Sequence, residues 1–540
     1  MRTFGMFFHY SNYLNCPLKF MKYSTLILIF LLPFCTKSFS ANHTEKDIRL
    51  FTFCKVWGCL KYCHPNSSTR SDFDLFLLKN LEKVKNCNDI EFNIIIGDFI
   101  ASLGLFTKNS HSSNPTIDSS RFRWIDLSVI LNNSNKKALK MIIKAGNGNG
   151  SLIRTERNCS DKAVELELMK VEDSMEINNN VALLSLFKYW NIVNFFYPYK
   201  NILPRNWDST LYDYASEFDT ISSRKSYVLL LNRLTTELHD CHTFIIPRKK
   251  HDKLFGQYYP DFCIEFMNDT TFISWIDSSS TLQIGDIIES INDTTISEYR
   301  NKFKTIYGCS TPVSLESRIN IYLLSGNLGR IFRLKVNRAG NLLNIEVILK
   351  NRVMHWWEGL HFQTNVLKKI DKDIILFEPG LVHKETLKML KNELKHSKAV
   401  IVDMRYNSDY DFPNWFIKNN RSFCTSYHPN NKIPGDFLAS SEYSYFYKLG
   451  CGKKYKGQIF VLVNENTQSS LEFETLRLKY GSNAILIGSN TSGTDGNVCS
   501  FRLPGQIDIY ATFYGISNPG GKLGQTDHRP SDKAHHLMPV

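Results

Sequence analysis

Two adjacent serines and a glutamate follow an apolar run of the chain. The segment 457–480 reads GQIFVLVNENTQSSLEFETLRLKY, in which residues 459–463 predict a buried strand and the residues from Ser469 and Ser470 onward predict a helix. A serine at a helix start lies beside backbone N–H groups that have no intrahelical partner, at the positive end of the helix dipole. Such a position can hold a nucleophile and stabilise an oxyanion.

The same residues also suit a purely structural role. Ser469 and Glu472 have the S-x-x-E spacing of a capping box, in which each side chain accepts from a backbone N–H of the other residue. A helix cap and a catalytic serine are therefore both open from this segment alone, and the rest of the chain has to distinguish them.

A catalytic serine needs several elements around it, and the chain is long enough to supply them. Its 540 residues predict about three or four domains. Hydrophobic residues make up 43% and charged residues 22%, which is typical of globular protein. The net charge of +13 comes from Lys and Arg spread along the chain, without a basic run, a P-loop or a zinc finger. We therefore expect no nucleic acid partner.

The N-terminal region has the pattern of a secretory signal peptide. A short basic start at Met21-Lys22 precedes an apolar stretch of about a dozen residues and small residues near Ser40-Ala41. Residues 1–40 are thus read as an upstream extension plus a signal peptide, with translation from Met1 or Met21 left open. The prediction is an exported, periplasmic or extracellular protein without an integral membrane domain. An uncleaved signal that keeps it membrane-associated is the alternative.

The thirteen cysteines do not form a recognisable framework. Two lie in or before the signal, and the odd number that remains cannot all pair within one chain. Neither the cysteines nor the histidines have the spacing of metal ligands, so no metal and no cofactor are expected. The disulfide pattern and the oligomeric state stay undetermined.

Composition and periodicity divide the chain into helical, β-rich and alternating regions. Helical periodicity dominates before residue 250, strand patterns follow, and strands then alternate with helices, which is typical of a largely parallel sheet. The predicted fold class is multidomain α/β (α+β overall). The predicted domains are 1–40 (extension and signal), 41–180 (helical and mixed), 181–250 (helical), 255–350 (β-rich) and 354–540 (α/β core).

The two helical regions resemble each other. Trp57 and Trp190 each precede a proline by eight residues, and an aromatic–aspartate pair follows each proline. These pairs are Phe73-Asp74 and Trp207-Asp208. A partial internal duplication is therefore expected, with the aromatic residues packed in the core.

Five segments, taken in order, resemble one enzyme family. They are LFKYWNIVNFFYPYKN with NWD, the segment ELHDCHTF, GDIIESIND, AVIVDMRYN, and VLVNENTQSSLEFE followed by LIGSNTSGTDGNV and RLPG. Together they resemble the tail-specific (carboxyl-terminal processing, tricorn-core-like) serine peptidases, in particular exported Bacteroidetes-type members with a PDZ-like domain. The resemblance covers roughly residues 180–530 and implies a ClpP/crotonase-like α/β core, a polypeptide substrate and serine-type hydrolysis of peptide bonds.

Carried over by position, the resemblance assigns the nucleophile to Ser469 and the base to His242. Thr494 stands where lysine-dependent members have their lysine, so a histidine-based arrangement is the better match. A serine hydroxyl is a weak nucleophile and needs such a base within hydrogen-bond reach. Without the family, a core or capping role is the favoured interpretation of His242.

The resemblance implies roles for further residues. The Ser470 N–H would hold the oxyanion, and the GDI turn of the PDZ-like module would bind peptide. The supporting residues are Glu472, Asp403, Arg405 and Asn407, and the peptide-binding residues are Gly285, Asp286 and Ile287.

Three departures from the family pattern favour an alternative. Asp409 and Tyr410 stand where a small turn residue is usual. Cys241 stands directly before the histidine, where the family usually has glycine or serine. The C-terminal segment has no glutamate, which leaves Asp527 as a weakly supported third catalytic residue. The alternative is a catalytically inactive protein of this fold that binds peptides or hydrophobic ligands.

Overall fold

The computed structural model describes most of the chain after the predicted signal. The described residues are 43–67, 72–106, 119–146, 153–154, 164–165, 176–248, 256–277, 280–350, 367–379, 384–405, 415–430, 433–443, 455–482 and 484–521. In this part of the chain, none of the helices combines the length and the apolar character needed to cross a bilayer. The predicted signal peptide lies outside these residues.

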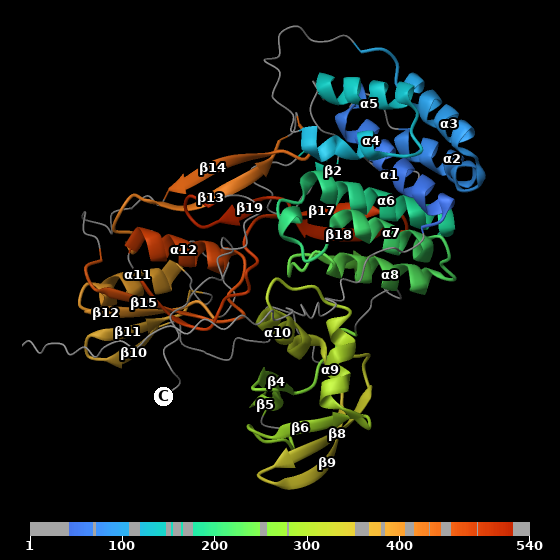
Figure 1. Ribbon diagram of the computed structural model, residues 1–540. Coiled ribbons are helices and arrows are strands. Elements are labelled where there is room, and N and C mark those ends of the chain that lie inside the picture. The colour runs from blue at the N-terminus through green and yellow to red at the C-terminus, as the bar shows by residue number, and fades with distance from the viewer. Residues whose placement is uncertain are drawn as a thin grey trace, which may run out of the picture. The chain divides into compact units, whose positions relative to one another are not determined.

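Helices dominate the first half of the chain, as their periodicity predicts (Figure 1). Several begin at paired caps, such as the reciprocal hydrogen bonds of Thr44 with Asp47 and of Asn88 with Glu91. One hydrophobic core joins both helical regions. The helices are α1 (Glu45–Cys63), α2 (Phe73–Asn86), α3 (Asp89–Ser102), α4 (Arg123–Leu127), α5 (Asn133–Ala145), α6 (Asn179–Phe196), α7 (Trp207–Phe218) and α8 (Arg224–Thr236).

The sequence repeat has a structural counterpart in α1–α2 and α6–α7. The indole N–H of Trp57 donates to the carbonyl of Phe73 over 3.0 Å. The indole N–H of Trp190 donates to the carbonyl of Trp207 over 2.9 Å. Each tryptophan thus ties its helix to the start of the next one by the same bond. The equivalent bonds support an internal duplication.

The two copies also exchange ion pairs. Lys55, two residues before Trp57, pairs with Asp208 at 2.8 Å. Lys188, two residues before Trp190, pairs with Asp74 at 2.9 Å. Each lysine therefore contacts the aspartate of the other copy.

Helices α1 and α6 cross closely at a glycine. A Cβ atom added to Gly58 of α1 would lie 1.8 Å from the Asn191 side chain of α6, so the crossing requires glycine. The amide of the same Asn191 side chain donates to the carbonyl of Cys54 at 3.1 Å, so a hydrogen bond also joins the two helices.

A three-stranded sheet connects the helical region with the C-terminal part of the chain. Its order is β17 (Val498–Leu503), β18 (Ile507–Thr512) and β3 (Phe244–Pro247), all antiparallel. Buried residues of β17 and β18 belong to the same core as the helices. The strand after His242 is therefore held by a segment more than two hundred residues later.

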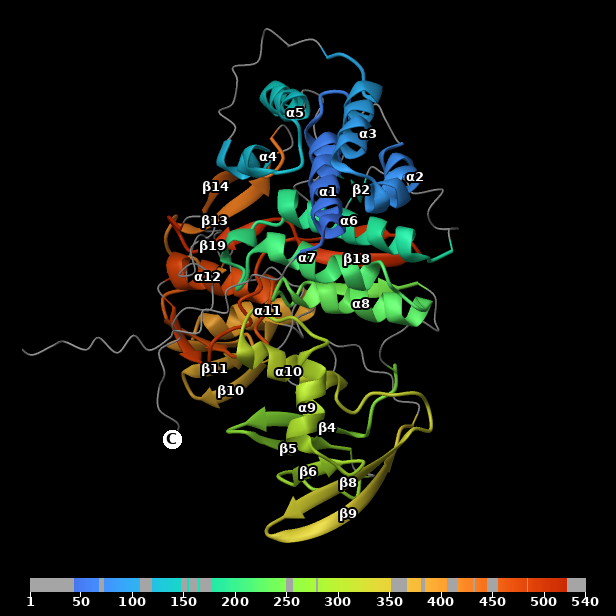
Figure 2. The ribbon, with the colours of Figure 1, turned by 45° about the vertical axis from the view of Figure 1, so that its right-hand side comes forward.

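Residues 262–348 form a β-rich module with its own hydrophobic core (Figure 2). The sheet order is β4-β5-β6-β8-β9, with β7 paired to β6, so β4 lies at one edge. The elements are β4 (Phe262–Met267), β5 (Thr270–Ile276), β6 (Ile287–Ile291), β7 (Thr294–Thr295), α9 (Ile296–Lys304), α10 (Pro312–Tyr322), β8 (Ile331–Arg338) and β9 (Asn341–Ile348).

The last region contains the predicted parallel sheet, and the multidomain α/β class is confirmed. The order is β10-β11-β12-β15-β16, in which β11, β12, β15 and β16 run parallel and β10 is antiparallel. Its elements are β10 (Leu367–Asp371), β11 (Ile374–Phe377), α11 (Lys384–Leu394), β12 (Ala399–Asp403), β15 (Gln458–Val463), α12 (Ser470–Ser482) and β16 (Ile485–Gly488). A second sheet contains β14 (Phe437–Tyr443), β13 (Ser422–Pro429) and β19 (Gly515–Ser517).

Candidate active site

Ser469 lies in the turn that joins the carboxyl end of β15 to α12. Its backbone has a φ of 57°, a left-handed conformation that residues other than glycine rarely adopt. Such a conformation costs about 1–3 kcal/mol and persists where the surrounding structure enforces it, often at functional sites. The Ser469 hydroxyl has no hydrogen-bond partner among the described residues, and the residue is half-buried. The turn thus presents an unpartnered hydroxyl at the start of a helix.

Glu472 holds this turn in place through hydrogen bonds. The residue is 1% exposed, and its carboxylate accepts from the N–H of Ser469 at 3.2 Å. It also accepts from Thr491 Oγ1 and from the N–H groups of Gly493 and Thr494, at 2.6, 2.7 and 2.8 Å. Only half of the predicted capping box is present, because the Ser469 hydroxyl does not accept in return within the described residues. The carboxylate instead locks the loop 491–494 against the serine turn.

The pH dependence of stability should report on Glu472. Burial raises the pKa of Glu472 from 4.5 to about 7, and the hydrogen bonds to Thr491 and to the backbone oppose that rise. The native state therefore binds a proton more tightly than the unfolded chain, so Glu472 contributes most to the free energy of unfolding below pH 4.5 and less as the pH rises toward 7. Urea unfolding at pH 5 and pH 8 should show that the wild-type advantage over Glu472→Gln shrinks by up to about 3 kcal/mol. An advantage that is constant with pH would contradict the assignment.

His242 is buried in a short turn between α8 and β3. Its backbone N–H donates to Asp240 Oδ1 at 2.9 Å, and the Tyr197 hydroxyl donates to the other carboxylate oxygen of Asp240 at 3.2 Å. The ring Nδ1 lies 3.2 Å from Thr512 Oγ1 of β18. Burial is the largest cause that lowers the pKa of His242 from 6.5, which favours a neutral ring near pH 7.

The sequence motifs did not indicate that Asp240 and Thr512 hold His242. Asp240 precedes His242 by two residues in the segment ELHDCHTF, so its position was an available signal. Thr512 has no such signal, because only the pairing of β3 with β18 brings it near.

Ser469 and His242 are connected through the loop 491–494 rather than by a direct bond. No hydrogen bond joins the two side chains in the described structure. The Ser492 hydroxyl lies 3.3 Å from the thiol sulfur of Cys241, the neighbour of His242. Glu472 holds the adjacent residues of the same loop. Thr494, which occupies the lysine position of other members, is buried within this network.

Helix α10 of the β-rich module packs against the histidine turn. Arg318 Nη2 donates to the carbonyl of Cys241 at 3.3 Å, and Ser314 lies 3.6 Å from the Cys241 thiol. The module and the histidine turn are therefore in direct contact. Another face of α10, which includes Ser317, lines a large pocket.

Asp403 and Arg405 lie at the carboxyl end of β12, next to β15 in the sheet. The buried Asp403 carboxylate accepts from Arg405 Nε at 2.9 Å and from Nη2 at 2.7 Å. This pair fixes the direction of the chain as it leaves the strand. The other residues predicted in this region, Asn407, Asp409 and Tyr410, and the candidate Asp527, lie outside the described residues.

The residues predicted to bind peptide form a turn of the β-rich module. Gly285 has a φ of +90°, which makes the tight turn before β6 possible. Asp286 is 2% exposed and pairs with Arg338 at 2.7 Å, which holds the pKa of its carboxyl below the usual value. Neither these residues nor Ile287 line the large pocket described next. Their role in peptide binding stays a prediction.

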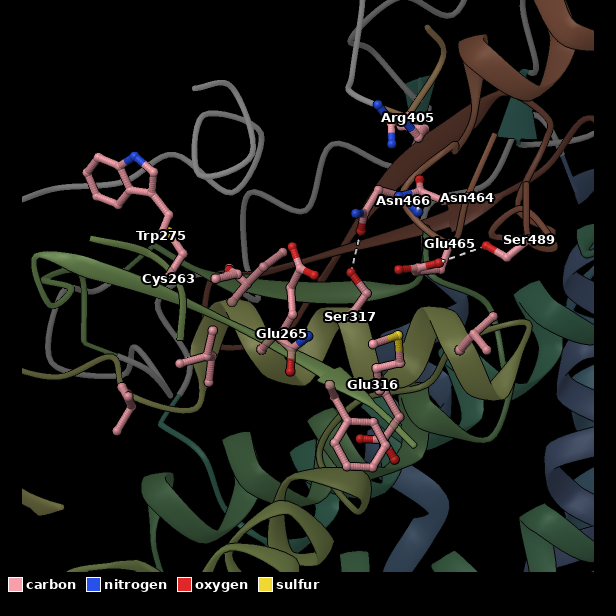
Figure 3. A pocket seen from close by; sticks show the side chains of 18 of the residues that line it. Cys263, Glu265, Trp275, Glu316, Ser317, Arg405, Asn464, Glu465, Asn466 and Ser489 are labelled. Atoms are coloured by element: carbon pink, nitrogen blue, oxygen red, sulfur yellow. Dashed lines mark hydrogen bonds between the residues drawn. The ribbon is translucent and has the colours of Figure 1, made fainter. Parts of the chain in front are cut away.

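A pocket near the serine turn has a volume of about 960 Å³ (Figure 3). One wall comes from β4 and α10, and the other from Arg405 and residues 464–466, which follow β12 and β15. Ligands of parallel α/β sheets usually bind outside the carboxyl ends of the strands, where this pocket lies. Glu465 and Asn466 precede Ser469 by four and three residues, so the pocket adjoins the serine turn. No sequence pattern indicated the residues of the facing wall.

The chemistry available here is nucleophilic and acid–base. Within the described ranges, no cluster of three or more His, Cys, Asp or Glu side chains is arranged to hold a metal ion. The histidine, the buried carboxylates and the exposed start of α12 can move a proton and stabilise a negative charge.

Comparison with known proteins identifies the region that contains the serine turn. Residues 379–528 match the model of peptidase family S41. This segment includes β12, β15 and α12, and thus Asp403, Ser469 and Glu472. No curated protein sequence matches the chain.

Solved structures with a similar fold include mature CPAF complexed with lactacystin. That structure has 13% identity and a TM-score of 0.53, and the match covers 66% of this chain and 93% of the other. Mature CPAF alone has 12% identity and a TM-score of 0.50, with 65% and 91% coverage. At this identity the likeness shows the fold alone. The chain thus contains a region, residues 379–528, that matches peptidase family S41, as the sequence motifs predicted, and this match supports a serine-type peptidase.

Proposed function

We propose that the protein hydrolyses peptide bonds of exported proteins or peptides, with Ser469 as the nucleophile and His242 as the base. The observation that carries the proposal is the left-handed backbone of Ser469, whose unpartnered hydroxyl lies at the start of α12 within the family match. A residue that served only as a cap would have its hydroxyl bonded to the helix N–H groups. The strain and the missing partner together favour a nucleophile.

The chemistry follows from the positions of the groups. His242 accepts the hydroxyl proton of Ser469 as the oxygen attacks the scissile carbonyl, and it later gives this proton to the leaving amine. With its proton on Nδ1, the ring donates to Thr512 and keeps the Nε2 lone pair for the serine. The N–H of Ser470, the first residue of α12, stabilises the oxyanion. Water then releases the acyl group by the same steps.

The absence of a hydrogen bond between Ser469 and His242 in the described structure favours the second candidate, a peptide-binding protein without activity. Catalytic hydrogen bonds often tighten only when substrate binds, so the first proposal keeps precedence. Export rests on the predicted signal peptide, and polypeptide is the proposed substrate on the basis of the family.

Labelling by a fluorophosphonate probe separates the two candidates. The mature wild-type protein should form a covalent adduct at Ser469, located by peptide mass spectrometry. The labelling rate should fall below an apparent pKa lower than 6.5, because burial disfavours the charged form of His242. His242→Ala should lower the rate by about 10²-fold or more. A correctly folded wild-type protein without labelling between pH 6 and pH 9 would contradict the peptidase proposal and favour the binding candidate.

A further inference from the structure

The pocket beside the serine turn is acidic, although the chain as a whole is basic. Three glutamates line it: Glu265 on β4, Glu316 on α10 and Glu465 just before Ser469. The net charge of the chain is +13, so the acidity is local. Figure 3 shows Glu265 and Glu465 within this one pocket, one from each wall.

The three glutamates differ in how their charge is compensated. Glu316 pairs with Arg300 at 2.5 Å and with Lys304 at 2.8 Å. Neither Glu265 nor Glu465 forms an ion pair within the described residues. Glu465 accepts a hydrogen bond from Ser489 at 3.0 Å, which orients its carboxylate without removing the charge. The carboxylates of Glu265 and Glu465 therefore line the pocket without an ion pair, and Asp269 is a further acidic residue of its lining.

The cationic side chain of the pocket does not cancel them. Arg405 is the arginine that lines it, and both oxygens of Asp403 accept from its guanidinium group. Partial desolvation between the pocket walls, followed by the charge of Glu465, raises the pKa of Glu265, although solvent still reaches this side chain. Arg405 opposes the rise only as the smallest cause. The two carboxylates thus repel each other across the pocket, and a bound cation would relieve this repulsion.

The wall that carries Glu265 suits an extended peptide. Strand β4 lies at the edge of its sheet and pairs with β5 on one side. An extended peptide can add to such an edge, and its alternate side chains then reach pockets that determine specificity. Glu265 is exposed on this strand, so it lies where a peptide side chain would arrive.

We propose that this pocket selects polypeptides with a lysine or arginine side chain, which binds between Glu265 and Glu465 while the main chain lies along β4. This inference rests on the proposed function and names its substrate class. Glu465 and Glu265 are then specificity-determining residues that attract the substrate and have no part in bond cleavage.

Peptide binding to the full mature chain with Ser469→Ala tests the proposal. The probes are fluorescein-labelled decapeptides of one background sequence with a single lysine, arginine, norleucine or glutamate, scanned over all positions. Fluorescence anisotropy should show lysine and arginine peptides binding about tenfold more tightly than the norleucine peptide at the best position. The preference should weaken as salt is added, because the carboxylates are reached by solvent.

Charge-neutral variants identify the residues. Glu265→Gln with Glu465→Gln should reduce the preference for lysine to about twofold or less. Glu346→Gln is the matched control, an exposed glutamate on β9 outside the pocket, and should leave the preference intact. Equal binding of lysine and norleucine peptides, or a preference that survives the double variant, would overturn the proposal. Because Ser469→Ala does not turn over, this failure is distinct from a failure of wild-type labelling.

Discussion

Ser469→Ala is expected to reduce cleavage of fluorescein-labelled β-casein by at least about 10³-fold, because the substitution removes the atom that forms the acyl bond. The measurement is the initial rate of fluorescence release by the mature chain. Urea unfolding of the same sample should show a folded protein, since the half-buried hydroxyl has no hydrogen bond to lose among the described residues.

The neighbouring serine supplies the matched control. Ser470 is exposed, and the group proposed to stabilise the oxyanion is its backbone N–H, which alanine retains. Ser470→Ala should therefore keep the rate within about threefold, well inside the effect of a lost oxyanion donor. Equal losses in both variants would show that the turn is disturbed as a whole and that Ser469 has no special role.

Glycine at position 469 should reveal the strain directly. Because glycine adopts a φ near 57° without a steric penalty, Ser469→Gly should raise the free energy of unfolding by about 1 kcal/mol while activity is lost. A destabilised glycine variant would mean that the serine is there to support the helix.

Asp74→Asn is expected to lower the free energy of unfolding by about 3–5 kcal/mol. The Asp74 carboxylate is 5% exposed and pairs with Lys61 at 2.8 Å and with Lys188 at 2.9 Å. Both lysines are buried, so the substitution leaves two ammonium groups in the core with a neutral amide as their shared partner. Urea unfolding monitored by tryptophan fluorescence measures the loss.

The second copy of the repeat provides the control for this variant. Asp208, the counterpart of Asp74, has a side chain that is 42% exposed, so Asp208→Asn should reduce the free energy of unfolding by about 1 kcal/mol or less. Joint replacement of Lys61 and Lys188 by methionine and Asp74 by leucine should recover most of the loss, because the three charges of this cluster are then all removed. A small effect of Asp74→Asn alone would contradict the electrostatic account.

Local patterns predicted the elements well where one physical cause dominates. Residues 331–338 alternate in type, and they form β8 with alternate residues buried. Residues 459–463 are continuously apolar, and they form most of a strand flanked by parallel neighbours. In both cases the burial of one or two faces decides the conformation, and burial leaves its period in the sequence.

The site was predicted less completely, because its main features arise from distant parts of the chain. The motifs indicated Ser469, His242 and Glu472, but the left-handed φ of a serine follows from tertiary context. Of the two hydrogen bonds of the predicted capping box, only that from the Ser469 N–H to Glu472 is present among the described residues. The other three hydrogen bonds of Glu472 go to the loop 491–494. Glu265 and Glu465 line one acidic pocket although they lie two hundred residues apart, and no local pattern encodes such a shared site.

The exchanged ion pairs of α1–α2 and α6–α7 have the logic of an isologous dimer interface. In such an interface the same patch occurs twice, and each half contacts the other through equivalent residues. Here Lys55 reaches Asp208 while Lys188 reaches Asp74, within one polypeptide. The two halves thus contact each other as two equivalent subunits would, but they are not identical: the side chain of Asp74 is buried and that of Asp208 is 42% exposed.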